Sequence, residues 1–399
     1  MILHIDAPQI IHNTNNSELS AKIHFNGWNK GVKELWYRVD KEYSEYLCDE
    51  RGDAFLIALL PFALSRSTKE DPIIIESDAP ISEKLFYQLT IHFIPTLARC
   101  VSWCDSVKIK AELVHDKLPS KDAVGVGISG GVDSYYSLLK SLNSDPTHYK
   151  VTHGLFCENE YSGSFNNELQ TAYRNMAQKI CEGSNINFID IQSNICNDIY
   201  ELVHEVVVTN IYLSYAYTLQ KLFSTYYFSA SHLYEAFEIA EYSSEYSAVF
   251  NMYCMENENM SLYVTGADAI RHQKTAYIAN YELPKKYMMV CRNPYVEHGQ
   301  LKNCSKCSKC TRTMIDLDLA DKLDEFDKVF DVDNYRKNKE YYWGYLFFKG
   351  KKDAFIRETL ELMKQKHIKI PLSVRIAGIK KIIKNKGKRG NPLQTSYRP

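Results

Sequence analysis

The middle of the chain alternates short apolar runs with segments of helical periodicity. Four apolar runs predict buried strands, at residues 123–128, 149–157, 186–191 and 226–230. Helices are expected between them, at residues 133–140, 168–181 and 211–223. Strands that are apolar throughout and alternate with helices are typical of a parallel sheet with helices on both faces. The pattern therefore predicts an α/β fold with a doubly wound parallel sheet between residues 118 and 245.

The segment before this sheet has a different pattern. Strands are predicted at residues 2–5, 21–25, 34–39, 73–76 and 107–114, and helices at residues 54–64 and 82–103. Pro61 and Pro95 lie inside the two helical segments, where proline is expected to break or kink a helix. A polar connector at residues 117–121 follows. We therefore predict an N-terminal α+β domain, residues 1–117, that would bind an acceptor or a partner.

The rest of the chain divides into two further parts. Residues 118–315 are expected to form the nucleotide domain, and residues 316–399 a mainly helical C-terminal region. The clearest helices of that region are predicted at residues 353–366 and 373–384. The last dozen residues are basic and rich in Gly and Pro, which is typical of disorder.

Composition narrows the class of protein by exclusion. The 399 residues carry a net charge of −1, which argues against a nucleic-acid partner. No apolar run reaches the roughly 18–20 residues that a membrane span needs, and the N-terminus has no secretory pattern. Eleven cysteines are an odd number, and several stand alone in apolar segments. This favours a reducing, cytoplasmic setting with metal-binding cysteines over a disulfide framework.

The strand at residues 123–128 leads into Ser129-Gly130-Gly131 and then into a helix that begins near Asp133. Adjacent glycines let the backbone approach a ligand closely, and a helix N-terminus attracts anions. No lysine follows the glycines, so this is not the GxxxxGK[ST] loop of the common NTPases. The spacing predicts a phosphate-binding loop, and the alternative is a structural glycine turn.

This string resembles the Ser-Gly-Gly-x-Asp-Ser loop of the PP-loop ATP pyrophosphatases, which include asparagine and GMP synthetases, tRNA thiolases and 7-cyano-7-deazaguanine synthases. The resemblance implies that the loop binds ATP and grips the leaving pyrophosphate, and that Asp133 helps to position Mg²⁺. The ATP-binding residues implied are Ile128, Ser129, Gly130, Gly131, Val132, Asp133 and Ser134.

A second motif lies downstream, where Cys304, Cys307 and Cys310 fall within seven residues and Cys291 precedes them. Four thiolates around Zn²⁺ make a closed, structural site. The alternative is an iron–sulfur cluster, but the fourth cysteine of the bacterial ferredoxin run is replaced here by Met314. With the glycine loop, the motif is similar to the 7-cyano-7-deazaguanine synthases, in which four cysteines hold zinc beside the active site. The resemblance covers residues 120–315, with a longer gap between Cys291 and Cys304 and extra residues at both ends.

Polar residues after two other strands are candidates for the chemistry. Arg271 and Lys274 follow a predicted strand at 261–264, and either could neutralise a phosphate in the transition state. The alternative is a solvated basic helix start. His232 and Glu235 follow the strand at 226–230, where His232 would be a general base or an ordinary histidine. Cys157 would be a sulfur carrier or a structural cysteine.

These features favour an ATP-dependent ligase or amidotransferase-like enzyme with Asp133, Lys274 and Arg271 as its catalytic residues. It would adenylate a carboxylate or amide oxygen, release pyrophosphate, and let a nitrogen nucleophile displace AMP. The resemblance implies a heterocyclic acid as substrate. Members of this family with added domains act outside tRNA modification, including in antiphage systems, so a protein or peptide could also be the acceptor. A homodimer is a further possibility. The alternatives are a tRNA thiolase and a non-catalytic ATP-binding scaffold.

Overall fold

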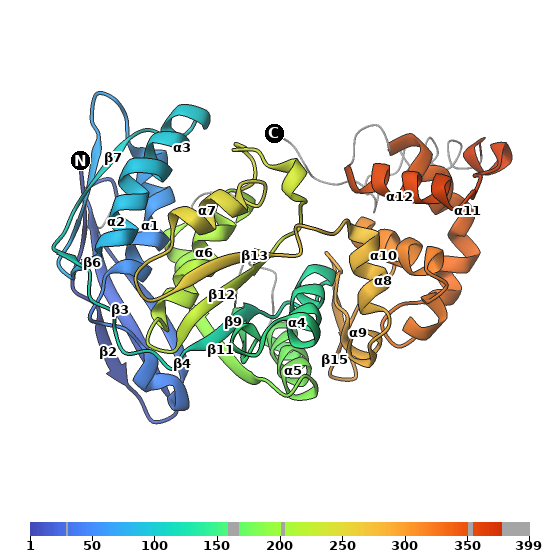
Figure 1. Cartoon of the computed structure of the whole chain (residues 1–399), viewed down its shortest axis with the longest axis horizontal. Helices are drawn as coiled ribbons and strands as arrows, with labels where there is room; N and C mark the ends of the chain where they lie inside the picture. Colours follow the sequence, from blue (N-terminus) through green and yellow to red (C-terminus); the bar gives the residue numbers. More distant parts are fainter. Residues whose placement is uncertain (29–30, 159–166, 201–203, 350–353, 377–399) are drawn as a thin grey trace. The chain divides into compact units, whose positions relative to one another are not determined.

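A computed structural model describes residues 1–28, 31–158, 167–200, 204–349 and 354–376 (Figure 1). The chain forms two compact units. Unit 1 comprises Met1–Ile128, Lys140–Asn166 and Cys181–Asp268, and unit 2 comprises Ser129–Leu139, Asn167–Ile180 and Ala269–Pro399. These units divide the chain at other places than the domain boundaries that we predicted at residues 117 and 315. The helix predicted at 373–384 is described only at residues 373–376, which are helical. Its remaining residues and the basic tail lie outside the described part of the chain.

Unit 1 is built on one large sheet, and five of its strands form a parallel block. They are β9 (Ala123–Gly127), β10 (His153–Glu158), β11 (Asn187–Ser193), β12 (Phe223–Ser229) and β13 (Ser261–Thr265). Numbered by their order in the chain, these strands run 3-2-1-4-5 across the sheet, which is the order of a doubly wound fold. The α/β class is confirmed. Between β9 and β12 the strand order reverses, and ligands of such sheets bind where the strands end at this point.

The N-terminal strands continue the same sheet. They are β1 (Ile2–Ile5), β2 (Gln9–His12), β3 (Asn16–Phe25), β4 (Val32–Asp40), β5 (Ile73–Ser77) and β7 (Val107–Lys110), with β6 (Ile81–Ser82) and β8 (Leu113–Val114) as a separate pair. β4 pairs antiparallel with β11, where Val39 lies opposite Ile191. Residues on both sides of the predicted boundary at 117 therefore share one hydrogen-bonded sheet and one core.

Two apolar helices pack together in this core, α1 (Asp53–Arg66) and α6 (His204–Thr218) (Figure 1). We expected Pro61 to break or kink its helix. The helix is not broken, because α1 continues through Pro61. Proline removes the N–H that would pair with the carbonyl of Ile57. The Asn210 side-chain amide donates to that carbonyl instead, at 3.2 Å. Tertiary structure thus satisfies the acceptor that the proline leaves open.

The second proline follows a local change of helix type. The segment predicted as one helix consists of α2 (Glu83–Gln88), a π-turn at Leu89–Phe93 and α3 (Ile94–Cys100). Pro95 stands in the first turn of α3, where a missing N–H costs little. Unit 1 also contains the short α-helix α7 (Ala248–Cys254).

Unit 2 is mainly helical. Its helices are α8 (Arg271–Ile278), α9 (Glu282–Tyr287), α10 (Ser308–Leu319), α11 (Val332–Lys349) and α12 (Ala354–Gln365), together with the N-terminal parts of α4 (Val132–Ser144) and α5 (Asn167–Gly183). A small hairpin of β14 (Tyr295–Glu297) and β15 (Gln300–Lys302) precedes the cysteine motif. The predicted helix at 353–366 is confirmed as α12.

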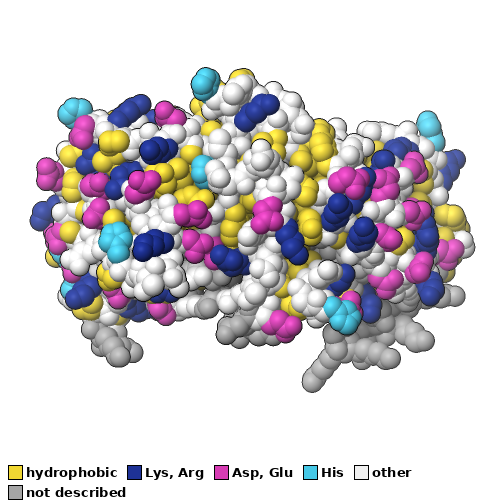
Figure 2. Space-filling view, turned by 90° about the horizontal axis from the view of Figure 1, so that it is seen from below, with side chains coloured by type: hydrophobic (Ala, Val, Ile, Leu, Met, Phe, Trp, Pro, Cys, Tyr) yellow, Lys and Arg dark blue, Asp and Glu magenta, His cyan; other side chains and the backbone are white. Residues whose placement is uncertain are grey.

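Two properties are relevant to possible partners: the charge of the surface, and the length and apolar character of the helices. On the face drawn in Figure 2, acidic and basic side chains mingle without a large area of one sign. This mixing of signs on the drawn face agrees with the net charge of −1. Within the described ranges, none of the helices is both long enough and apolar enough to cross a lipid bilayer.

Candidate functional site

The glycine loop has a backbone that only glycine adopts easily. Gly130 has a φ of +71°, in the left-handed region. A Cβ at this position would lie 2.7 Å from Cε of Met176 on α5, so this flexible side chain would have to shift, and the positive φ is the main reason for glycine here. The next residues start α4, where the N–H of Tyr135 donates to the carbonyl of Gly131 at 3.0 Å.

The two serines of the loop turn their hydroxyls toward its backbone. The N–H of Ser129 donates to Oγ of Ser134 at 3.2 Å, and the N–H of Gly131 donates to Oγ of Ser129 at 3.3 Å. The loop therefore gathers amides and hydroxyls at the start of a helix, an arrangement suited to an anion. Val132 is buried, 1% exposed, so it could offer a ligand little besides its backbone.

The loop is fastened to the segment that leads to the cysteines. The N–H of Met289 donates to the carbonyl of Gly130 at 2.8 Å, two residues before Cys291. Asn303 holds the same segment, because its Oδ1 accepts from Val290 at 3.1 Å and its Nδ2 donates to the carbonyl of Met288 at 2.9 Å. Sequence reasoning missed Asn303. Its only sequence signal is its position next to Cys304.

The structure brings the four predicted cysteines together. Their Sγ atoms all lie within 4.8 Å of one another. Sγ of Cys307 is 3.9 Å from that of Cys291 and 3.5 Å from that of Cys310. A tetrahedron with Zn–S bonds of about 2.3 Å has edges of about 3.8 Å. In a cubane cluster each thiolate binds a different iron, which separates the sulfurs further. The spacing therefore fits a single metal ion such as zinc.

Backbone amides surround these sulfurs. The N–H groups of Asn293 and Cys304 donate to Sγ of Cys291, each at 3.2 Å, and the N–H of Cys307 donates to Sγ of Cys304 at 3.3 Å. Such bonds stabilise thiolates and orient them toward a metal. The bound ion would supply structure, because four protein ligands leave no open position for a substrate.

The three predicted catalytic residues also meet. Nη1 of Arg271 lies 2.5 Å from Oδ2 of Asp133, and Nζ of Lys274 lies 3.0 Å from Oδ1. Lys274 is only 1% exposed, which does not fit the alternative of a solvated helix start. Burial alone would raise the pKa of Asp133, but the two cations outweigh it and hold that pKa at about 2. Both carboxylate oxygens are engaged, so a role in positioning Mg²⁺ would require that Asp133 exchange at least one of these partners.

Replacing Asp133 by Asn is therefore expected to destabilise unit 2. The change leaves two largely buried cations without their counter-charge, at a cost of about 3 kcal/mol in the free energy of unfolding. The double variant Asp133→Asn/Lys274→Met removes one of these cations and should recover part of the loss. Since the folded pKa lies below the usual value, the contribution of Asp133 should be present at neutral pH and disappear as pH falls from about 4 toward 2. Denaturant titrations at several pH values would measure both effects.

The control for this prediction is the ion pair of Asp268 with Lys140, whose side chains are 52% and 37% exposed. Asp268→Asn should cost less than about 1 kcal/mol, because water screens an exposed pair. Equal effects of the two substitutions would show that the contacts of Asp133 contribute no special stability.

Sequence reasoning also missed a carboxyl group near Arg271. Asp316 on α10 is 2% exposed, and its Oδ2 is without a hydrogen-bond partner in the described part of the chain. Burial raises the pKa of Asp316 to about 7, against the opposing effect of Arg312 and Arg271. Shifts of this kind are common at functional sites. Asp316 and Asp318 both lie on α10, and their spacing gives no pattern from which the burial of Asp316 could have been predicted.

In unit 1, two serines at the end of β12 have buried hydroxyl groups. The hydroxyls of Ser229 and Ser231 are buried, and neither has a hydrogen-bond partner among the described residues. They stand where β12 ends, beside the reversal of strand order, and a buried hydroxyl without a partner is a candidate ligand contact. His232 stacks on the ring of Tyr246, with centroids 3.8 Å apart. This contact gives His232 a packing role, and no described contact favours it as a general base.

Cys157 shows no sign of activation. It is the second-last residue of β10, and the loss of hydration there raises the pKa of its thiol well above the ordinary value, with a further rise from Asp190. The thiolate, which is the reactive form, is therefore disfavoured. Its neighbours Asn159 and Glu160 lie outside the described residues.

One more group in unit 1 could hold a metal ion. Ligand atoms of His4, Asp6 and Asp78 lie within 4.8 Å of one another at the surface of the sheet. Nε2 of His4 is 3.5 Å from Asp6 and 3.2 Å from Asp78. These distances also suit ordinary hydrogen-bonded ion pairs, so the group is weaker evidence than the four cysteines.

Comparison with protein-family models, with curated proteins and with solved structures gives no match for this chain.

Proposed function

We propose that this protein is an ATP-dependent enzyme of the PP-loop type. It would transfer AMP from ATP to a carboxylate or amide oxygen and release pyrophosphate, and a nitrogen nucleophile would then displace AMP to form a C–N bond. This is the chemistry that the resemblance to the 7-cyano-7-deazaguanine synthases implies. A heterocyclic acid, a small carboxylate or a protein acceptor would each suit it.

One observation carries the proposal. The Ser129–Ser134 loop directly follows β9, the strand at which a 3-2-1-4-5 sheet reverses its order. Dinucleotide- and nucleotide-binding α/β proteins use this position for their phosphates. The positive φ of Gly130 and the inward hydroxyls of Ser129 and Ser134 are the features that a phosphate-binding loop needs.

The other residues would act around the bound phosphates. The loop amides and hydroxyls would hold the pyrophosphate, and Arg271 and Lys274 would stabilise the negative charge that grows on it. Asp133 keeps both cations in place, and it would take part in binding Mg²⁺ after releasing one of them. The zinc site would hold Met289, and through it the carbonyl of Gly130, in position.

ATP should accordingly be cleaved between its α and β phosphates. Incubation with ATP, Mg²⁺ and a panel of heterocyclic and aliphatic acids is expected to yield AMP and pyrophosphate, measured by ion-exchange chromatography and a pyrophosphate assay. Ser134→Ala should reduce the rate at least about tenfold, a typical cost of losing a hydrogen bond in the transition state. Ser137→Ala is the matched control, because Ser137 is a buried serine of the same helix outside the loop.

The products themselves decide between reaction types. ADP and phosphate would contradict the proposal, since cleavage between the β and γ phosphates is the chemistry of a different class of loop. An unchanged rate in Ser134→Ala would remove the loop from the mechanism even if AMP were formed.

A non-catalytic ATP-binding protein is the second candidate, and the pairing of Asp133 favours it. Both oxygens of this carboxylate are held by Arg271 and Lys274, which would suit a protein that binds ATP without Mg²⁺-dependent turnover. ATP binding by calorimetry without any AMP formation, in the presence of all candidate acids, would support this reading. The tRNA thiolase gains no support, because the thiol of Cys157 has a raised pKa.

A further inference from the structure

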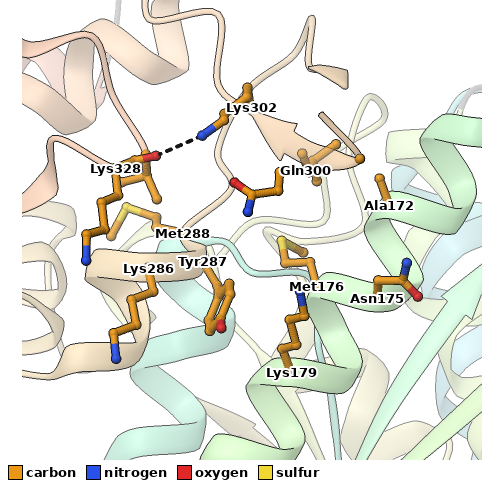
Figure 3. Close-up of a pocket in the computed structure, with 13 residues that line it drawn as sticks. Ala172, Asn175, Met176, Lys179, Lys286, Tyr287, Met288, Gln300, Lys302 and Lys328 are labelled. Atoms are coloured by element: carbon orange, nitrogen blue, oxygen red, sulfur yellow. Dashed lines mark hydrogen bonds between the residues drawn. The ribbon is translucent and has the colours of Figure 1, made fainter. Parts of the chain in front are cut away.

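A pocket of about 340 Å³ lies within unit 2 (Figure 3), and Asp133, Arg271 and Lys274 are not among the residues that line it. Thirteen residues from α5, the end of α9, the β14–β15 hairpin and the segment before α11 line it: Ala172, Asn175, Met176, Lys179, Lys286, Tyr287, Met288, Gly299, Gln300, Leu301, Lys302, Lys328 and Val329. Four of them are lysines and none is acidic. In Figure 3, Lys286 and Lys328 extend on one side of Tyr287, and Lys179 lies on the other.

Carboxylates offset little of the charge of these lysines, although Glu282 attracts Lys286 at longer range. Within the described residues, none of the four makes an ion pair. The ammonium of Lys302 reaches only the main-chain carbonyl of Lys328, at 3.5 Å, and that of Lys179 lies 5.9 Å from the ring centre of Tyr287. By contrast, the neighbouring Lys285 is paired with both Glu282 and Glu325. Like charges around one hollow repel each other, so an anion that enters it relieves this repulsion.

The rest of the lining indicates the kind of anion. Met176, Met288 and Leu301 offer apolar contact, while the amides of Asn175 and Gln300 offer hydrogen bonds. A few polar groups within an apolar wall are typical of sites for small organic molecules, and the volume lies in their usual range. The lysines surround a hollow and do not form a track, which favours a small molecule over a nucleic-acid strand. Glu168 lines an adjoining pocket of about 310 Å³ and does not line this one.

We propose that this lysine pocket binds a small organic polyanion, one that carries at least two phosphate or carboxylate charges beside an apolar part. The pocket shares residues with the support of the glycine loop. The side chain of Met176 lies next to Cα of Gly130. Met288 directly precedes Met289, whose N–H donates to the carbonyl of Gly130. The ligand is therefore bound next to the loop but by different side chains, and binding does not require that ATP be hydrolysed.

The test uses citrate and inorganic pyrophosphate as probes with the full-length protein at constant ionic strength. Acetylation by an amine-reactive reagent is followed at each lysine by mass spectrometry. At least one probe is expected to slow acetylation of Lys179, Lys286, Lys302 and Lys328, with Lys306 and Lys337 unchanged as exposed controls. Citrate alone would identify a carboxylate ligand, and pyrophosphate alone a phosphate ligand.

Variants separate this pocket from the glycine loop. The double variant Lys302→Met/Lys328→Met should weaken probe binding at least about tenfold by calorimetry, because two of the four charges are lost. The variant Lys337→Met/Lys369→Met changes net charge equally at exposed positions outside the pocket and the cysteine motif, and it should bind as the wild type does. Ser134→Ala should leave the lysine protection intact.

Three results would overturn the inference. Equal losses in the two double variants would show only a general charge effect. A second result would be protection by pyrophosphate that is lost in Ser134→Ala and kept in the pocket variant. Pyrophosphate would then bind at the glycine loop, so the proposed function would stand and this inference would be wrong. Protection by a single-stranded RNA oligonucleotide, with neither small anion effective, would assign the lysines to a nucleic-acid surface.

Discussion

Removal of residues 1–117 is expected to leave a chain that does not stay in solution. β4 covers the edge of β11, and α1 packs along α6, so the deletion uncovers both a strand edge and an apolar helix. Buried polar groups lose their partners as well, because Asn257 donates to Asp53 at 2.9 Å. A typical domain is stable by only roughly 5–15 kcal/mol, so the loss of a strand pairing, a helix packing and buried hydrogen bonds at once is expected to unfold the fragment. The measurement is the soluble fraction of the 118–399 fragment after expression, compared with the full chain.

A second experiment tests whether the lost contacts are the cause of the insolubility. Co-expression of residues 1–117 and 118–399 as separate chains should restore solubility, since all of the lost pairings can form again between them. A fragment 118–399 that is soluble, monomeric and melts cooperatively by itself would contradict the prediction. It would show instead that residues 1–117 are not needed for the rest of the chain to fold, as the predicted domain boundary at residue 117 implies.

Loss of the metal is expected to have the second large effect. Cys310→Ser should remove roughly one equivalent of zinc and lower the free energy of unfolding of unit 2 by several kcal/mol, since structural zinc sites couple metal binding to folding. Metal content by mass spectrometry and thermal unfolding would measure these changes. Because Met289 connects the cysteine segment to the glycine loop, hydrogen exchange at its amide should become faster.

Cys254→Ser is the matched control for this substitution. Cys254 and Cys310 are both 0% exposed, so each change places a hydroxyl in a buried site, and only one of them removes a metal ligand. Similar losses of stability in both variants would show that burial and not metal explains the effect. Iron with acid-labile sulfide in the wild-type protein would replace zinc by a cluster and revive the thiolase alternative.

If the metal supports the loop, the two proposals for unit 2 become connected. Met288 lines the lysine pocket, Met289 holds the Gly130 carbonyl, and Val290 is held by Asn303 beside the cysteines. One short segment thus contacts the metal site, the loop and the pocket in turn. Chelation of the metal should weaken both nucleotide and polyanion binding, while the pocket variant should weaken only the second.

Local patterns predicted most of the strands and helices. The strand predicted at residues 2–5 is β1, and the helix predicted at 168–181 is α5 (Asn167–Gly183). Boundaries were less certain where an apolar run continues from one element into the next. The predicted helix at 211–223 is α6, which ends at Thr218, and β12 begins at Phe223. Periodicity cannot place this border, because most residues of both elements are buried, the polar ones included, so neither element shows a polar face.

The sequence by itself determined the short-range parts of this protein. The glycine turn before α4 and the three close cysteines depend on residues a few positions apart, so their conformations follow from local chemistry. The tertiary structure alone decided the rest: that β4 joins β11, that Asn210 satisfies the carbonyl opposite Pro61, and that Arg271 and Lys274 pair with Asp133. These contacts join residues more than a hundred positions apart. Their formation depends on how whole elements pack, and no local pattern of residues encodes that packing.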